Sequence, residues 1–218
     1  MGLTPQSYFV VGTDTNVGKT YISSAILRHF AANGSKTIGM KPIASGCELD
    51  AQGEFMNEDV SVLVQASNVV APIDLVNPYR FIPAIAPHIA AEQINVEIKL
   101  DVISKAYEQL NTLADVVIVE GAGGFLVPIN QHQTLADLAL ALDIPIILVV
   151  GMRLGCINHA LLTVEAMRAR GLHLAGWIAN QIDPEMAMFE ENLQSLQQRI
   201  AVPCLSIARW QGDVTFNS

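Results

Sequence analysis

The sequence predicts a doubly wound α/β fold, in which a mostly parallel sheet carries helices on both faces. Short runs that are apolar on both faces alternate along the chain with helical stretches whose apolar residues recur every three or four positions. This alternation is typical of parallel strands joined by helical crossovers. With 218 residues, of which 51% are hydrophobic and 15% charged, the chain can bury a sizeable core, and we expect one domain over residues 1–218.

Five strands are expected because their residues are mainly aliphatic or β-branched, with no polar face. In chain order they are YFVV at 8–11, TIGM at 37–40, VVIV at 116–119, IILVV at 146–150 and LAGWIA at 174–179. Strands that are apolar on both faces belong in a sheet covered on both sides. Ligands of such a sheet bind beyond the carboxyl ends of its strands, so we expect the chemistry there.

Helices are expected between these strands, at 20–32, 101–113, 135–142, 157–170 and 186–199. Gly34 and Gly171 follow two of them, where a glycine commonly ends a helix. The stretch 44–87 is less regular, with polar and proline-rich patches around one helix near 59–66. We expect it to overhang the carboxyl edge of the sheet.

Composition excludes several classes of protein. Twelve Lys and Arg against 21 Asp and Glu give a formal net charge of -9, so nucleic acid is not an expected partner. Three cysteines without a C-x-x-C spacing indicate neither a disulfide framework nor a zinc site and suit a reducing compartment. Acidic residues and a proline interrupt the apolar stretch 135–150, and the run 8–11 is too short for a signal peptide. We therefore expect a cytoplasmic protein with no membrane partner.

A glycine-rich loop follows the first expected strand and opens the first expected helix. It reads Gly12-Thr13-Asp14-Thr15-Asn16-Val17-Gly18-Lys19-Thr20. In a P-loop, backbone N–H groups and the positive end of the helix hold phosphates, the lysine reaches the β- and γ-phosphates, and the hydroxyl after it binds Mg²⁺. Five residues separate Gly12 from Gly18, where the usual pattern has four, so the sequence predicts a longer variant of a nucleotide-binding loop.

Glu120 follows the strand 116–119, which is the arrangement that sets a carboxylate beside Mg²⁺ in nucleotide-hydrolysing folds. By itself it is more commonly an ordinary acid at the end of a strand. The glycines that follow, from Gly121 to Gly124, either allow a ligand to approach the backbone closely or simply turn the chain. The nearby P-loop favours the ligand-binding interpretation of both.

Lys41 and Ser45, in KPIASG at 41–46, follow the second expected strand and so fall on the same edge of the sheet as Lys19. Two ammonium groups near one triphosphate indicate that developing negative charge is stabilised there. As isolated residues they are more commonly a solvated lysine and a turn serine. Asp59 is by itself an ordinary helix acid, and residues 155–159 are either a plain helix start or an anion site.

Four segments together resemble the dethiobiotin synthetase family. They are the loop 12–20, KPIASG at 41–46, VEGAGG at 119–124 and LGCINHA at 154–160, and the resemblance runs from about Tyr8 to Asn180. It implies a Mg²⁺- and ATP-dependent enzyme of biotin biosynthesis that inserts CO2 between the two amines of 7,8-diaminononanoate. The products are dethiobiotin, ADP and phosphate, formed through a carbamate and a carbamic-phosphoric anhydride. No covalent enzyme intermediate is involved, which suits a site of lysines and backbone N–H groups.

The resemblance also implies the role of each site residue. Catalysis would rest on Lys41, Lys19 and Thr15, and Mg²⁺ on Thr20, Asp59 and Glu120. The nucleotide would be held by Thr15, Asn16, Val17, Gly18, Lys19, Thr20, Glu120, Gly121, Ala122, Gly123, Asn180 and Gln181. The diamine would meet Ser45, together with Gly155, Cys156, Ile157 and Asn158 from the second subunit of a homodimer. The remote carboxylate of the diamine would be bound by Gly155 to Asn158 of the second subunit, and Asn180 would contact the edge of the adenine base.

Two stretches depart from the family pattern. Asn16 stands where a family member carries an acidic residue, which implies an altered contact near the substrate amines. SIARW at 206–210 stands where the family has a Gly-Glu-Ile-Pro-like turn that helps to hold the base and ribose. The second departure implies a looser preference for adenine.

Two other classes share parts of these motifs. A nucleotide-dependent switch of the partitioning or cell-division type has the same kind of sheet and loop, but it typically has a further lysine near positions 13–15 and, where membrane-bound, a basic amphipathic terminus. An amide synthase of the cobalamin type needs an additional glutamine-hydrolysing domain, for which 218 residues are too few. Phosphate release that depends on the diamine distinguishes the synthetase from the switch.

Overall fold

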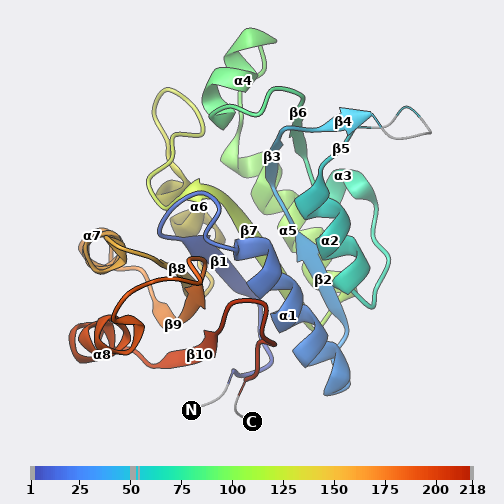
Figure 1. Cartoon of the computed structure of the whole chain (residues 1–218). Helices are drawn as coiled ribbons and strands as arrows, with labels where there is room; N and C mark the ends of the chain where they lie inside the picture. The colour runs from blue at the N-terminus through green and yellow to red at the C-terminus, as the bar shows by residue number, and fades with distance from the viewer. Residues whose placement is uncertain (1–2, 50–52, 54, 217–218) are drawn as a thin grey trace.

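Six parallel strands form the central sheet of the computed structural model, which describes residues 3–49, 53 and 55–216. Across the sheet the order is β10-β9-β8-β1-β7-β2. Their bounds are β1 Tyr8–Gly12, β2 Thr37–Met40, β7 Val116–Gly124, β8 Ile146–Met152, β9 Leu174–Gln181 and β10 Cys204–Ala208. Every adjacent pair runs parallel, so all six carboxyl ends meet at one edge (Figure 1).

Side chains of β1 alternate between two cores, as expected for a sheet that is covered on both faces. Tyr8 and Val10 pack in the core beneath α1 (Lys19–Ala32), whereas Phe9 and Val11 pack in the larger core on the opposite face. That opposite face is covered by α5 (Leu100–Leu113), α6 (Leu135–Leu142), α7 (Cys156–Ala169) and α8 (Phe189–Arg199). The predicted doubly wound fold is therefore confirmed.

The position of β1 indicates where a ligand of this sheet would bind. β1 lies between β7 and β8; the chain leaves it toward the β2 edge and later returns through β7 to build β8, β9 and β10 on the other side. Helices on the two sides therefore diverge at the carboxyl end of β1, which leaves a crevice at this switch point. The loop 13–18 lies in that crevice.

The irregular stretch contains several short elements that stand over the carboxyl edge near β2 (Figure 1). β3 (Ile43–Ser45) pairs with β6 (Tyr79–Phe81), and β4 (Glu48–Leu49) pairs with β5 (Phe55–Met56). Three helices lie in or directly after this stretch: α2 (Glu58–Ala66), which packs beside α1 and β2, α3 (Ile73–Val76) and α4 (Pro87–Gln93). The expected overhang is present, and it forms one wall of the site.

Besides the short elements of that stretch, three features differ from the sequence-based expectations. β7 continues to Gly124 and pairs with β1 there, so Glu120 lies within a strand and the glycines after it extend the strand instead of turning the chain. Helix α8 begins at Phe189 and not at 186, because Met188 adopts the left-handed conformation (φ 53°). The edge strand β10 was not expected from its mixed sequence CLSIA.

The segment after β10 folds back toward α1. Tyr21 of α1 donates a hydrogen bond to the Gly212 carbonyl, and Ser206 Oγ donates to the Thr215 carbonyl at 2.7 Å. Phe216 packs against His29. Within the described part of the chain, no helix has both the length and the apolar character needed to cross a membrane.

Candidate active site

The glycine-rich loop is anchored from below by β9. Asn180 Nδ2 donates a 2.8 Å hydrogen bond to the Val17 carbonyl. Gly18 has φ 84°, and a Cβ atom at this position would lie only 2.2 Å from Asn180 Nδ2. Both the left-handed backbone and the close approach therefore require glycine at the start of α1.

Lys19 and Asp14 hold the loop in a compact form. Lys19 Nζ donates to the Asp14 carbonyl at 2.9 Å, and the Asp14 side chain accepts from the Thr15 N–H and forms an ion pair with Arg153. Burial, helped by repulsion from Lys41, lowers the pKa of Lys19 to about 8. Sequence reasoning missed Asp14 and Arg153, because their pairing spans 139 positions in the chain.

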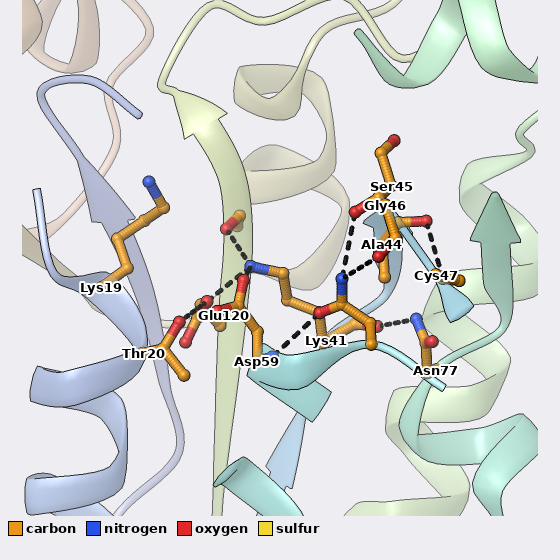
Figure 2. A network of polar contacts seen from close by, with 12 residues as sticks. Lys19, Thr20, Lys41, Ala44, Ser45, Gly46, Cys47, Asp59, Asn77 and Glu120 are labelled. Atoms are coloured by element: carbon orange, nitrogen blue, oxygen red, sulfur yellow. Dashed lines mark hydrogen bonds and ion pairs between the residues drawn. The ribbon is translucent and has the colours of Figure 1, made fainter. Parts of the chain in front are cut away.

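Lys41 lies at the centre of a network of polar contacts (Figure 2). Its Nζ donates to Asp59 Oδ2 at 2.9 Å, to Glu120 Oε1 at 2.5 Å and to the Gly121 carbonyl at 3.3 Å. The hydroxyl of Thr20 donates to the same Glu120 oxygen at 2.9 Å. The three residues expected to bind Mg²⁺ therefore lie together, with an ammonium group among them.

Charges in this network outweigh the effect of burial. Burial disfavours the charged form of Lys41, but the carboxylates of Glu120 and Asp59 together raise the pKa of Lys41 above its usual value. Burial likewise opposes ionisation of Asp59, yet the nearby Lys41 ammonium lowers the pKa of that carboxyl. The ion pairs thus favour the charged form of both partners.

Two asparagines position the wall that carries Lys41 and Ser45. Asn77 Nδ2 donates to the Lys41 carbonyl at 2.5 Å. Asn57 Nδ2 donates to the Ser45 carbonyl at 3.0 Å, while its Oδ1 caps α2 by accepting from the Asp59 N–H at 3.0 Å. The local pattern Asn57-Glu58-Asp59 is a helix-start signal that could have identified the cap, although not its contact with Ser45.

A cavity of about 860 Å³ opens above these groups. The predicted site residues that line it are Thr15, Asn16, Gly18, Lys19, Thr20, Lys41, Ser45, Asp59, Glu120, Ala122 and Gly123. Its other walls come from the overhanging stretch, at Ile43, Ala44, Asn57 and residues 84–87, and from Val127. Sequence reasoning did not identify this second group. A cavity of this size accommodates a nucleotide tail together with a small acceptor.

The remaining predicted residues lie outside the cavity lining. Val17 is buried beneath the loop, and Gly121 contributes its carbonyl to Lys41. Asn180 contacts the loop from below, and Gln181 accepts a 3.4 Å hydrogen bond from the Trp210 N–H. Gly155, Cys156, Ile157 and Asn158 form the start of α7, next to Leu154, which is 94% exposed.

The donor set fits a hard divalent cation. Glu120 is completely buried, and its Oε2 atom has no hydrogen-bond partner in the structure. In the described ranges no three His, Cys, Asp or Glu side chains cluster as a metal site, so the protein offers two carboxylates and the Thr20 hydroxyl. Mg²⁺ is usually bound by one or two carboxylates together with water and substrate phosphates, and this set of donors fits that coordination.

The fold and this loop together define a P-loop nucleotide-binding protein. A family described as an AAA domain matches residues 6–218. MinD of Aquifex aeolicus aligns with a TM-score of 0.58 at 14% identity, over 94% of this chain and 82% of that one. FtsY of Elizabethkingia anophelis aligns with a TM-score of 0.55 at 17% identity, over 99% of this chain and 63% of that one. These likenesses concern the fold alone.

Sequence relatives are more specific. The ATP-dependent dethiobiotin synthetase BioD of Nitrosospira multiformis is 54% identical over 93% of this chain and 87% of its own length. The protein of the same name from Aromatoleum aromaticum is 52% identical over 93% of this chain and 90% of its own length. The chain belongs to the family of ATP-dependent dethiobiotin synthetases.

Proposed function

We propose that the chain is an ATP-dependent dethiobiotin synthetase, a ligase that closes the ureido ring of dethiobiotin in biotin biosynthesis. One amine of 7,8-diaminononanoate adds to CO2 and loses a proton, which gives a carbamate. A carbamate oxygen then attacks the γ-phosphorus of ATP and ADP leaves. The second amine attacks the carbonyl of this anhydride and loses a proton, so that phosphate leaves and the ring closes.

The observation that carries this proposal is that lysines from two strand ends meet in one cavity. Lys19 follows β1, Lys41 follows β2, and both line the cavity with Thr15 and Ser45. Lys19, Thr15 and the loop N–H groups would bind the transferring phosphoryl group. Lys41 and Ser45 would neutralise and orient the carbamate, and Ser45 Oγ is a buried group with no hydrogen-bond partner in the structure. The chemistry then needs no nucleophile from the protein.

Mg²⁺ would be held by Thr20, Asp59 and Glu120. When bound, it supplies positive charge beside the phosphates. The buried, unpartnered Glu120 Oε2 supports this role, because a carboxylate oxygen without a partner is costly unless a ligand satisfies it. Glu120 through Gly123 would follow the phosphates along β7.

A homodimer would complete the site. The start of α7 is exposed at Gly155 and Asn158, and it does not line the cavity of its own subunit. The positive end of this helix suits a carboxylate, although the Cys156 N–H already donates to the Arg153 carbonyl at 3.0 Å, so we assign Gly155, Cys156, Ile157 and Asn158 to the remote end of the diamine bound by the partner subunit.

The base would lie beside Asn180 and Gln181. The first N–H of the Asn180 amide is used on the Val17 carbonyl, which leaves a donor and an acceptor for the adenine edge. Gln181 faces the divergent stretch through Trp210. We also propose a cytoplasmic location, supported by the three cysteines, which are all unpaired thiols.

The test is phosphate release with ATP, Mg²⁺ and bicarbonate, with and without the diamine, together with mass spectrometry of the product. We expect release only with the diamine, and a product that is heavier than the diamine by one carbonyl and lighter by two hydrogens. Slow release that ignores the diamine, with ATP, GTP and CTP alike, would instead indicate a nucleotide-dependent switch.

A further inference from the structure

Lys41 places a positive charge where the proposed metal ligands converge (Figure 2). Its Nζ contacts both carboxylates, Asp59 at 2.9 Å and Glu120 at 2.5 Å, as well as the Gly121 carbonyl. The Lys41 side chain is 5% exposed and that of Glu120 is 0% exposed. The Asp59 side chain is 42% exposed, so the buried carboxylate of Glu120 is the group that most needs a neighbouring cation.

Only the side chain of Lys41 is free to leave this position. Its backbone N–H donates to the Val76 carbonyl at 2.9 Å, and its own carbonyl accepts from Asn77 at 2.5 Å. Asn77 is itself buried. These bonds fix the main chain at the end of β2, so any movement of the ammonium must come from rotation about side-chain bonds.

Ser45 offers the Lys41 ammonium a second polar group within the same cavity. Lys41 and Ser45 line the cavity together, and Ser45 Oγ is buried with no hydrogen-bond partner. A lysine side chain is long enough to sweep between neighbouring groups while its main chain stays fixed. In the structure the ammonium is turned toward Asp59 and Glu120 and is therefore engaged away from the acceptor side.

We propose that Lys41 acts as a stand-in cation, neutralising Asp59 and Glu120 until a divalent metal arrives with the nucleotide and displaces the ammonium toward Ser45. The inference rests on the proposed function only for the identity of the metal and of the acceptor. It adds an order of events: Lys41 becomes free to meet the carbamate only after the metal and nucleotide are bound. Binding of the nucleotide, the phosphoryl donor, thus completes the part of the site that holds the carbamate, the phosphoryl acceptor.

Lysine labelling tests this displacement without turnover. The whole protein is acetylated briefly, and the modification of Lys41 is measured by peptide mass spectrometry without ligand, with ADP and EDTA, and with ADP and Mg²⁺. We expect labelling of Lys41 to rise about tenfold or more only when Mg²⁺ is present, because only the metal competes for the two carboxylates. Lys36, the exposed lysine just before the other end of β2, is the internal control and should not change.

Labelling that is unchanged by Mg²⁺, or that rises equally with ADP and EDTA, would refute the stand-in role. A second measurement uses Mn²⁺ alone as the probe in electron paramagnetic resonance of the nucleotide-free protein. Lys41→Met should bind Mn²⁺ about tenfold more tightly than the unaltered protein. The control variant Lys36→Met should bind Mn²⁺ as weakly as the unaltered protein. Equal Mn²⁺ affinity in a folded Lys41→Met protein would also overturn the inference, and the labelling result decides if that variant does not fold.

These readouts are separate from the proposed reaction. Failure of diamine-dependent phosphate release would refute the synthetase function and leave the metal-dependent labelling intact. Normal release with no change in Lys41 labelling would retain the function and reject the displacement.

Discussion

Gly18 offers the sharpest test of how the nucleotide-binding loop is built. Replacing it by alanine puts a residue with a side chain into the left-handed conformation, which destabilises the folded protein by roughly 1–2 kcal/mol. Alanine also makes the unfolded chain less flexible, which offsets about half of this loss. The new Cβ also lies 2.2 Å from Asn180 Nδ2, so the side chain of Asn180 must move. Losing its hydrogen bond to Val17 adds about 1 kcal/mol, and local overpacking adds at least a further ~1 kcal/mol.

The expected total for Gly18→Ala is therefore about 3 kcal/mol, which lowers the melting temperature by roughly 6–12 °C in a domain of this length. Gly34→Ala is the matched control, because Gly34 also has positive φ (89°) but would place its Cβ in open space. That variant has only the backbone strain, and its melting temperature should fall by about 1–4 °C. Scanning calorimetry of both variants measures the difference.

A double variant separates strain from collision. In the double variant Gly18→Ala with Asn180→Ala the colliding amide is absent. The double variant should therefore lose less stability than the sum of the losses in the two single variants. An interaction free energy of about 1 kcal/mol or more is expected. Equal melting temperatures for Gly18→Ala and Gly34→Ala, or strictly additive effects in the cycle, would refute the close-approach argument.

Three further predictions concern ligands. Lys41→Ala should abolish product formation while ADP affinity, measured by calorimetry with EDTA, stays nearly unchanged, and a large loss of affinity would instead place Lys41 at the phosphates. Asn158→Ala should raise the KM for the diamine and preserve kcat; an unchanged KM with lost turnover would contradict its contact with the carboxylate. Because burial holds the pKa of Lys19 near 8, below its ordinary value of 10.5, ATP phosphates should raise it again, so that binding takes up a proton and weakens as pH rises above about 8. Calorimetry of ATP binding at pH 9 in two buffers of different ionisation enthalpy checks this, and equal heats would argue against it. The lowered pKa of Lys19 also affects folding: the nucleotide-free protein should gain stability between about pH 8 and 10.5, because the unfolded chain binds more protons there.

Local patterns were sufficient for the sheet and the loop. The five expected strands are short runs with apolar side chains on both faces, and the motif before α1 depends on neighbours in sequence alone, so neither needed tertiary information. β10 and the short strands β3 to β6 were missed because two to five residues carry too little periodicity to be distinguished from loops.

Several site residues could not be predicted from local patterns, because their roles depend on contacts between distant parts of the chain. Asp59 is unremarkable as a helix acid, and its place in the site depends on Lys41, 18 positions earlier, and on Glu120 beyond it. Asn57 and Asn77 matter because of the carbonyls that they hold, which no spacing rule reveals. Asn180 was reached only through the family resemblance, and the structure adds a physical reason for it: its amide supports the loop at Gly18.

The separate construction of the overhanging stretch has an evolutionary consequence. The proposed phosphate and metal ligands lie mostly on the six-stranded sheet, the loop after β1 and α1, whereas Ser45 lies in β3, which pairs with β6, and residues 84–87 connect β6 to the start of α4. Substitutions in that wall can change the shape offered to an acceptor without altering the register of the main sheet. Descendants of such a protein can therefore acquire new acceptors while inheriting an intact apparatus for phosphoryl transfer.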